Sequence, residues 1–393
     1  MNPGSERLPA LDAVRALAML LGIFLHAAIP YTFSGFPWPV IDSSRSLPLT
    51  LLIFVIHTFR MPAFFIVAGF FGHLLHQRLG TAGFLRHRAR RILLPLIASW
   101  LLLYPLIRLA WVWGGLRVIP ASFGHTFSSL ASLAFAPANL LRDLGFSHLW
   151  FLYYLLLVYG LVLASRALLI TLDTSGVVRS RIDAHLRAIA GSTEVIVLAF
   201  PTTILLLPMT SWGIDAPDAT VLPLVRCVLV YTAFFVFGWL LHRQPELLAR
   251  YGARWSRYLG AAVALLVPLF GLLYLVRGGV RDVSFALRFA YFFAYACATW
   301  TMALALLGTC IRFFVRASSN VRYLADASYW MYLLHLPIVL IAALLLADLR
   351  FPWAVKLVVI HVVVLPLLLA SYHLLVRFTW IGEVLNGRRL PRA

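Results

Sequence analysis

Long apolar stretches separated by short, arginine-rich segments run through the whole chain of 393 residues. A helix needs about 20 apolar residues to cross the hydrocarbon core of a bilayer, and about ten stretches are long enough. The predicted spans are residues 12–34, 49–75, 92–113, 148–170, 193–210, 221–241, 258–276, 287–309, 328–347 and 354–377. No repeat or linker divides the pattern, which predicts an all-α polytopic membrane protein with one integral-membrane domain over residues 1–393.

The composition excludes a soluble enzyme and a disordered chain. Hydrophobic residues make up 62% of the sequence and charged residues only 12%, about half the charged share of a soluble domain. Cys227, Cys297 and Cys310 are scattered and form no ligand pattern with histidines, which argues against a disulfide framework and a zinc site. We therefore expect no metal cofactor.

The chain carries 33 basic and 14 acidic residues, a net charge of +19, and all but one of the basic residues are arginines. With the N-terminus placed in the cytoplasm, 21 basic residues fall in cytoplasmic segments and seven in external ones. This bias follows the positive-inside rule and predicts that both termini are cytoplasmic. It also accounts for the basic charge without a nucleic-acid partner.

Arg108, Arg166 and Arg377 lie near the ends of spans and are counted with the adjoining loops, which leaves five basic residues deeper inside the predicted spans: Arg15, Arg60, Arg226, Arg288 and Lys356. A cation in a membrane helix normally faces a partner or a water-filled cavity. The last three have no obvious partner, and too few acids lie within the spans to neutralise them all, so the sequence predicts an anionic occupant of the bundle such as an anionic lipid.

Arg15 and His26 are eleven residues apart, which places them on one face of the first helix about 16 Å apart along its axis. One interpretation makes Arg15 an interfacial partner of Asp12 and His26 a buried histidine bonded to a carbonyl. The other interpretation makes both residues part of a functional site.

The order of these motifs resembles the acyltransferase-3 family of membrane O-acyltransferases. Arg15 and His26, after Leu11 and Asp12, are similar to the family's Arg-x10-His signature. Further segments resemble the family's second span, basic loop, fourth span and Ser-Tyr-x-x-Tyr-Leu-x-His-x-Pro element: residues 60–70, 86–91, 148–152 and 327–337. Residues 378–388 resemble a branch to which succinylation of periplasmic glucans is assigned. Ala68 stands where the family usually has serine.

The resemblance implies about ten helices around an acyl-CoA channel in the bacterial inner membrane. The implied reaction moves an acetyl or succinyl group from cytoplasmic acyl-CoA to a hydroxyl of an extracytoplasmic glycan. His26 is expected to be the general base, with a transient acyl carrier as the alternative. Arg15 would mark the inner end of the channel, and Arg60 would contact the oxyanion or a carboxylate of the donor.

Other side chains are expected to bind the two substrates. Arg86, Arg88 and Arg91 suit the phosphates of coenzyme A, although this loop could serve only to set the topology. Tyr329, Tyr332 and His335 share an arc of the ninth span and are predicted either to contact the donor or to support residues that contact it, with packing as the alternative. His148, Trp150 and His57 are the predicted acceptor-binding residues, with an aromatic belt at the outer surface as the alternative for the tryptophan.

Two other functions fit parts of the sequence. Ten spans with intramembrane cations and prolines also suit a transporter or flippase of an anionic envelope glycan or lipid, although no inverted repeat is visible. A non-catalytic assembly partner in an envelope complex is the second alternative. The expected partners are the bilayer, acyl-CoA and a glycan, and the sequence leaves the oligomeric state open.

Overall fold

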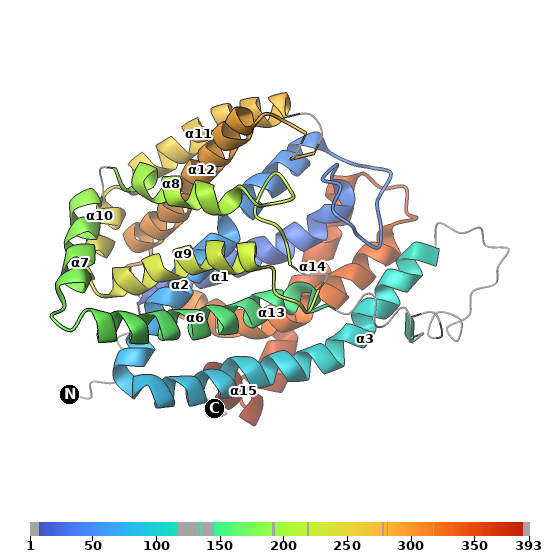
Figure 1. Cartoon of the computed structure of the whole chain (residues 1–393). Coiled ribbons are helices and arrows are strands. Elements are labelled where there is room, and N and C mark those ends of the chain that lie inside the picture. Colours follow the sequence, from blue (N-terminus) through green and yellow to red (C-terminus); the bar gives the residue numbers. More distant parts are fainter. Residues whose placement is uncertain are drawn as a thin grey trace.

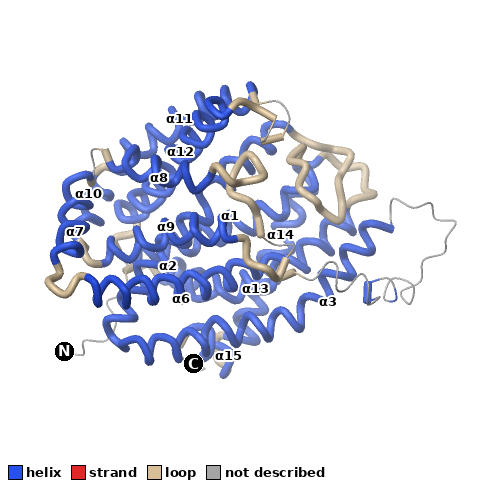
Figure 2. Tube along the Cα trace, in the orientation of Figure 1, coloured by secondary structure: helices blue, strands red, loops and turns tan. Residues whose placement is uncertain are grey.

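The chain folds into a bundle of helices (Figures 1 and 2). This computed structural model describes residues 8–116, 132, 134–135, 145–190, 193–217, 220–276, 279–280, 282–316 and 318–387. No strand occurs in these ranges, and the predicted all-α class is confirmed. The helices are α1 (Pro9–Ala28), α2 (Leu47–Arg88), α3 (Leu94–Leu116), α6 (Trp150–Leu172), α7 (Val177–Ile189), α8 (Glu194–Leu206), α9 (Val225–His242), α10 (Glu246–Ala253), α11 (Trp255–Leu275), α12 (Phe285–Phe313), α13 (Ser319–Leu346), α14 (Trp353–Ser371) and α15 (Trp380–Asn386).

Eight helical segments among the described residues are long and apolar enough to cross a membrane, or nine if the bent pair of α7 and α8 forms one span. One of the eight, Leu47–Leu116, holds two predicted spans in 70 residues. Gly80 breaks this segment with φ 64° and ψ −178°, a backbone conformation that glycine alone adopts readily. The fifth predicted span coincides with α8, which has only 13 residues. The count of ten spans remains a prediction.

The orientation of the termini also remains a prediction. Some of the arginines on which it depends, including Arg7, Arg117 and Arg142, lie outside the described residues.

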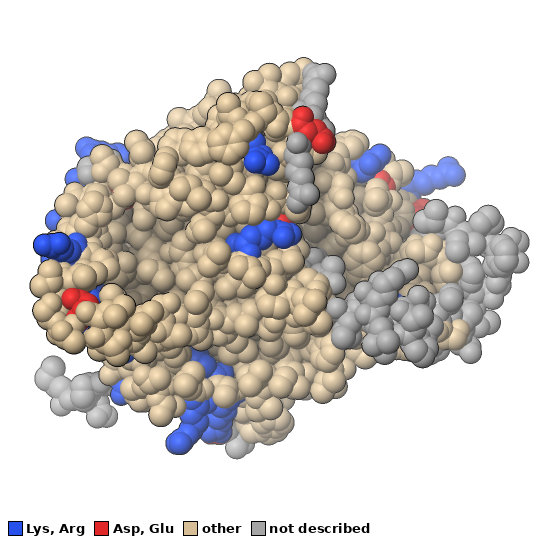
Figure 3. Space-filling view, in the orientation of Figure 1, with Lys and Arg blue, Asp and Glu red and all other residues tan. Residues whose placement is uncertain are grey.

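Large apolar side chains point outward from several of the long helices. Leu102 on α3, Val267 on α11 and Leu374 after α14 are 72%, 77% and 68% exposed. On the face in Figure 3, broad areas of the surface carry no charge, and a group of basic residues lies at the lower edge near α15. An apolar surface of this extent is unfavourable in water and suits the interior of a bilayer. The chain is therefore a multi-pass membrane protein.

The central helices of the bundle are α1 and α12. In their most apolar stretches, 67% and 78% of the residues are buried. Helix α1 packs against α2, α12, α13 and α14. Helices α2 and α9 cross with their backbones in contact, because a Cβ at Gly69 would overlap the Phe235 carbonyl and one at Gly238 the Ile66 carbonyl. Small residues at a crossing allow such close approach in a membrane, which explains Gly69 beside Ala68.

A fully buried ion pair ties the loop after α1 to α14. The Nζ of Lys356 lies 2.6 Å from a carboxylate oxygen of Asp42, with side-chain exposures of 2% and 1%. Asp42 also accepts a hydrogen bond from the amide of Ser44, whose hydroxyl accepts one from the amide of Trp353. The prediction that Lys356 lacks an acidic partner is wrong, because the partner lies in a loop rather than within a span.

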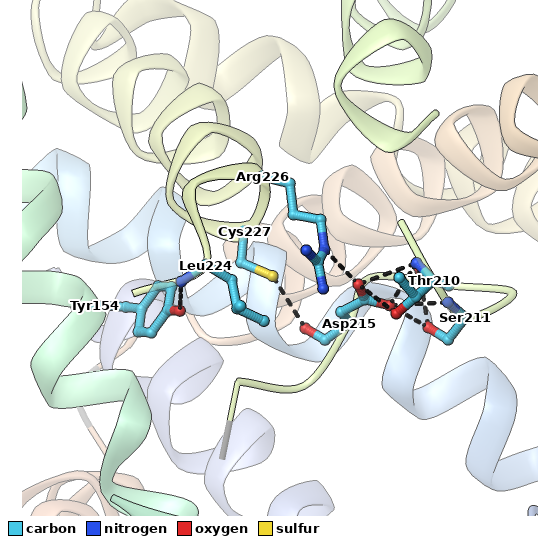
Figure 4. A network of polar contacts seen from close by, with 8 residues as sticks. Tyr154, Thr210, Ser211, Asp215, Leu224, Arg226 and Cys227 are labelled. Atoms are coloured by element: carbon cyan, nitrogen blue, oxygen red, sulfur yellow. Dashed lines mark hydrogen bonds and ion pairs between the residues drawn. The ribbon is translucent and has the colours of Figure 1, made fainter. Parts of the chain in front are cut away.

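Arg226 is also paired, with its Nε 2.6 Å from Asp215. Thr210 and Ser211 donate further hydrogen bonds to the same carboxylate (Figure 4). Burial alone would raise the pKa of Asp215, but the hydrogen bonds from Ser211 and Arg226 lower it below its ordinary value. The carboxylate therefore stays ionised opposite Arg226, and the expected anionic occupant is unnecessary there. Arg288 lies over the ring of Phe285, and its buried Nε has no hydrogen-bond partner among the described residues.

Removing one charge of the buried pair should destabilise the fold strongly. Lys356→Met or Asp42→Asn leaves a buried charge without its partner, which typically costs about 3–5 kcal/mol. The double variant Lys356→Met/Asp42→Leu should recover much of this loss. Thermal unfolding of the purified protein in detergent measures the effect. Arg90→Gln, which breaks an exposed pair with Glu383, is the control and should change stability by less than about 1 kcal/mol. Single variants as stable as this control would contradict a stabilising role for the buried pair of Lys356 and Asp42.

Candidate active site

A hydrogen bond between two histidines lies at the centre of the candidate site. His26 on α1 has its Nδ1 atom 2.8 Å from Nε2 of His335 on α13. His335 is 2% exposed, whereas His26 is only partly buried. The indole of Trp38, from the loop after α1, lies nearly parallel to the His26 ring with centroids 5.8 Å apart. The histidine of the Arg-x10-His motif therefore contacts two other parts of the chain, α13 and the loop after α1.

His148 reaches the same place because of a proline in α13. Pro337 has no amide hydrogen, so the carbonyl of Leu333 loses its usual helical partner. The Nε2 atom of His148 donates to that carbonyl at 2.9 Å. In return, the hydroxyl of Tyr332 donates to the His148 carbonyl at 2.7 Å. These two bonds fix the start of α6 on α13, with the His148 ring 5.1 Å from His335 and perpendicular to it.

The backbone just before His148 adopts an unusual conformation. Ser147 has φ 48° and is the one described non-glycine residue with a positive φ. Such a conformation costs of order 1–3 kcal/mol and persists where the surroundings enforce it. Here the bonds that His148 makes with α13 supply that constraint.

His148 and Trp150 lie inside the helix bundle. They are only 6% and 9% exposed. Trp150 packs against Tyr154 and Tyr231, with ring centroids 5.6 and 5.4 Å away. The physical reason is that the freed Leu333 carbonyl draws His148 inward, and Trp150 follows it into the aromatic interior. The indole therefore does not form part of an aromatic belt, and its acceptor-binding role remains a prediction.

Arg60 on α2 lies against the backbone of α1 one helical turn before His26. A Cβ at Gly22 would overlap the Nη1 atom of Arg60, so the absence of a side chain at Gly22 makes room for the guanidinium. Tyr231 and Tyr332 interact with Arg60 electrostatically, but no acidic side chain pairs with it in the described part of the chain. His57, three residues earlier on α2, packs beside Phe36 with centroids 5.7 Å apart.

Three polar atoms around the two histidines are buried without a hydrogen-bond partner among the described residues. They are Nε1 of Trp38, Nε of Arg60 and Nδ1 of His148. Buried polar atoms are nearly always paired in folded proteins, and an exception indicates a strained, catalytic or ligand-binding group. Here two donors and one acceptor converge on one region, as expected where a polar ligand binds.

A basic cluster forms at the junction of α2 and α3. Arg15, Arg88, Arg90 and Tyr329 all interact electrostatically with Arg91. The hydroxyl of Tyr329 donates to the Arg91 carbonyl at 2.8 Å. The guanidinium of Arg88 lies over the ring of Tyr159, 4.9 Å from its centroid, and Arg86 is exposed at the edge of the cluster. The structure thus brings together Arg15 and the loop arginines, which are far apart in sequence.

The C-terminal helix α15 covers part of the basic cluster. Glu383 lies 3.7 Å from Arg90. A Cβ at Gly387 would overlap the guanidinium of Arg91, so this arginine rests against the main chain just after α15. Helix α15 therefore contacts the basic loop, and Arg15 of α1 interacts with the same loop electrostatically.

Three residues of α13 connect the basic cluster with the histidines. Tyr329 interacts with Arg88 and Arg91, Tyr332 interacts with Arg60, and His335 is bonded to His26. Their spacing of three residues keeps them on one face of the helix, over a rise of about 9 Å. Both tyrosine hydroxyls donate to main-chain carbonyls, so they hold neighbouring segments on α13, and their contact with the donor remains a prediction.

Trp38 and Tyr231 were not among the residues singled out in the sequence, and Gly387 entered only as part of the segment 378–388. The Pro37-Trp38-Pro39 tripeptide was the available signal for Trp38, since prolines on both sides fix the backbone of a loop residue. Among the described residues, no group of three His, Cys, Asp or Glu side chains is placed to hold a metal ion.

Comparison with known proteins identifies the family. The family model described as "Acyltransferase domain", that of the acyltransferase-3 family, matches residues 8–373. Glucans biosynthesis protein C of Escherichia coli O157:H7 is 27% identical over 410 residues, covering 100% of this chain and 99% of the relative. The protein of that name from Escherichia coli K12 is 33% identical over 162 residues, 40% of this chain and 39% of the relative. No solved structure matches.

The family match extends over α1, α2, α13 and α14, which between them carry Arg15, His26, Arg60 and His335. The order of motifs in the sequence and the convergence of these helices agree with it. The chain belongs to the acyltransferase-3 family and is an acyltransferase.

Proposed function

We propose that the protein transfers an acetyl or succinyl group from cytoplasmic acyl-CoA to a hydroxyl of an extracytoplasmic glycan. The observation that carries this proposal is the set of unpaired polar atoms on Trp38, Arg60 and His148 around the bonded pair of His26 and His335. A pair of histidines with no further function would not need unpaired donors and an unpaired acceptor beside it.

The basic cluster is the proposed entry site for the donor. Arg86, Arg88 and Arg91 can bind the phosphates of coenzyme A, because arginine stays charged and binds phosphate oxygens in pairs. Arg15, in the first half of α1, interacts electrostatically with Arg91 of this cluster. From there the pantetheine arm would follow Tyr329 and Tyr332 along α13. The rise of about 16 Å from Arg15 to His26 along α1 suits an extended arm of this kind.

The chemistry proposed at the inner end of this path is general-base catalysis. His26 takes the proton of the attacking hydroxyl, and Arg60 receives negative charge one helical turn away. Arg60 is also a candidate to hold the free carboxylate of a succinyl donor, since it has no acidic partner among the described residues.

The acceptor is proposed to approach from the opposite side of the membrane. His148 offers an unpaired ring nitrogen to a sugar hydroxyl, and His57 and Trp150 complete the proposed acceptor side. The full-length similarity to a protein named for glucans biosynthesis supports a glucan as the acceptor class. A bacterial inner membrane would give acyl-CoA and a periplasmic glucan access to opposite faces. Only the acyl group would then cross.

Replacing His26 by alanine should abolish the reaction without loss of the protein. A positioned general base contributes about 10²- to 10⁴-fold to a rate, so His26→Ala should lose transfer by at least about 100-fold. Labelled acetyl- or succinyl-CoA incubated with membranes and periplasmic glucan measures the transfer.

His361→Ala is the matched control for that measurement, since this histidine of α14 donates to its own helix at Leu357 and packs on Phe24 of α1. Normal expression of His26→Ala with undiminished transfer would contradict the assignment. Glucan that crosses the membrane without gaining label would favour a transporter.

Replacing Arg60 should affect a succinyl donor more than an acetyl donor. Loss of a buried cation from a carboxylate costs about 2–5 kcal/mol, so Arg60→Gln should slow succinyl transfer at least roughly 30-fold beyond its effect on acetyl transfer. Gly22→Ala should act in the same direction because its methyl group displaces the guanidinium. Gly160→Ala is the control, as no atom lies near its added Cβ. Equal losses with both donors would contradict carboxylate recognition by Arg60.

A further inference from the structure

The direction of the hydrogen bond between His26 and His335 is determined by the second hydrogen bond that the His335 ring makes. His335 uses its other ring nitrogen, Nδ1, to contact the main-chain carbonyl of Tyr332 at 2.8 Å. A carbonyl oxygen can only accept, so the hydrogen of the His335 ring lies on Nδ1. In a neutral ring Nε2 then carries a lone pair. That lone pair must accept from Nδ1–H of His26.

The geometry of the two rings agrees with such a bond. Their planes are within 7° of each other, and the centroids are 5.0 Å apart while the facing nitrogens are 2.8 Å apart. The rings therefore lie nearly in a common plane, where the N–H of one points at the lone pair of the other. In rings stacked face to face with centroids 5.0 Å apart, the nitrogens would not approach to 2.8 Å.

We propose that His335 is a positioning residue that fixes the tautomer of His26 and so makes Nε2 of His26 the reacting nitrogen. The inference rests on the proposed role of His26 as general base. The sequence left open whether His335 contacts the donor or supports another residue, and the inference assigns it the supporting role and names the residue and atom that it acts on. Both hydrogen bonds thus run in one direction: the ring of His26 donates to the ring of His335, and the ring of His335 donates to the carbonyl of Tyr332.

The assigned tautomer gives a balanced acyl-transfer step. Nε2 of His26 takes the proton of the acceptor hydroxyl as the hydroxyl oxygen forms a bond to the thioester carbon. The carbon–sulfur bond then breaks, and the His26 imidazolium returns the proton to the departing thiolate. Throughout the step, Nδ1–H of His26 remains donated to His335, which holds the ring and stabilises the positive charge.

Two substitutions of His335 separate a positioning role from a donor-binding role. His335→Leu removes the acceptor, and kcat should fall about 10²-fold or more while the KM for acyl-CoA changes less than about twofold. His335→Gln places an amide oxygen near the position of Nε2, so it should recover a large part of kcat. Thermal unfolding of both variants in detergent checks that they are folded to a similar extent.

A double-variant cycle completes the test. In a His26→Ala background, adding His335→Leu should cause little further loss, because the residue it positions is gone. A rise in KM with kcat unchanged in His335→Leu would overturn the inference, as would independent losses in the double variant. If His26→Ala itself retained full transfer, the proposed function would fail instead, so the two failures are distinguishable.

Discussion

The contact between α1 and α13 at His26 and His335 is the constraint on which the rest of the site depends. In the interior of a membrane protein, each polar group must find a partner within the protein or a ligand. His335 obtains its partners from its own helix and from His26. Because Pro337 frees the Leu333 carbonyl, the same stretch of α13 also captures His148. One proline-interrupted helix thereby positions histidines from three parts of the chain.

The intramembrane cations fall into two physical classes. Lys356 and Arg226 each have a carboxylate at 2.6 Å, and these pairs fasten loops to helices. Arg60 has no such carboxylate among the described residues and lies beside the histidines, where it rests on the backbone at Gly22. Pairing therefore separates Lys356 and Arg226, which have structural roles, from Arg60, which is placed to meet a substrate, although the three look alike in the sequence.

Hydropathy was sufficient to predict the all-α class and the long apolar helices, because a segment that crosses a bilayer must be apolar along its length, but it did not predict the short helices α7, α10 and α15. Helical periodicity was sufficient to place Arg15 and His26 on one face. The long-range partners were not predictable, since nothing in one sequence links residues 309 or 314 positions apart, as in the pairs of His26 with His335 and Lys356 with Asp42. The contact of His148 with the Leu333 carbonyl was not predictable for the same reason, since the two residues are 185 positions apart.

Transfer across a sealed membrane tests most directly whether the basic cluster and the histidines form one path. Inverted bacterial membrane vesicles expose their cytoplasmic surface, and periplasmic glucan can be trapped inside them. With labelled acyl-CoA added outside, the account predicts label on the trapped glucan. Right-side-out vesicles given acyl-CoA and glucan outside should show none. Label appearing only in the right-side-out vesicles would contradict a donor site at the cytoplasmic end of the bundle and an acyl group that crosses at His26.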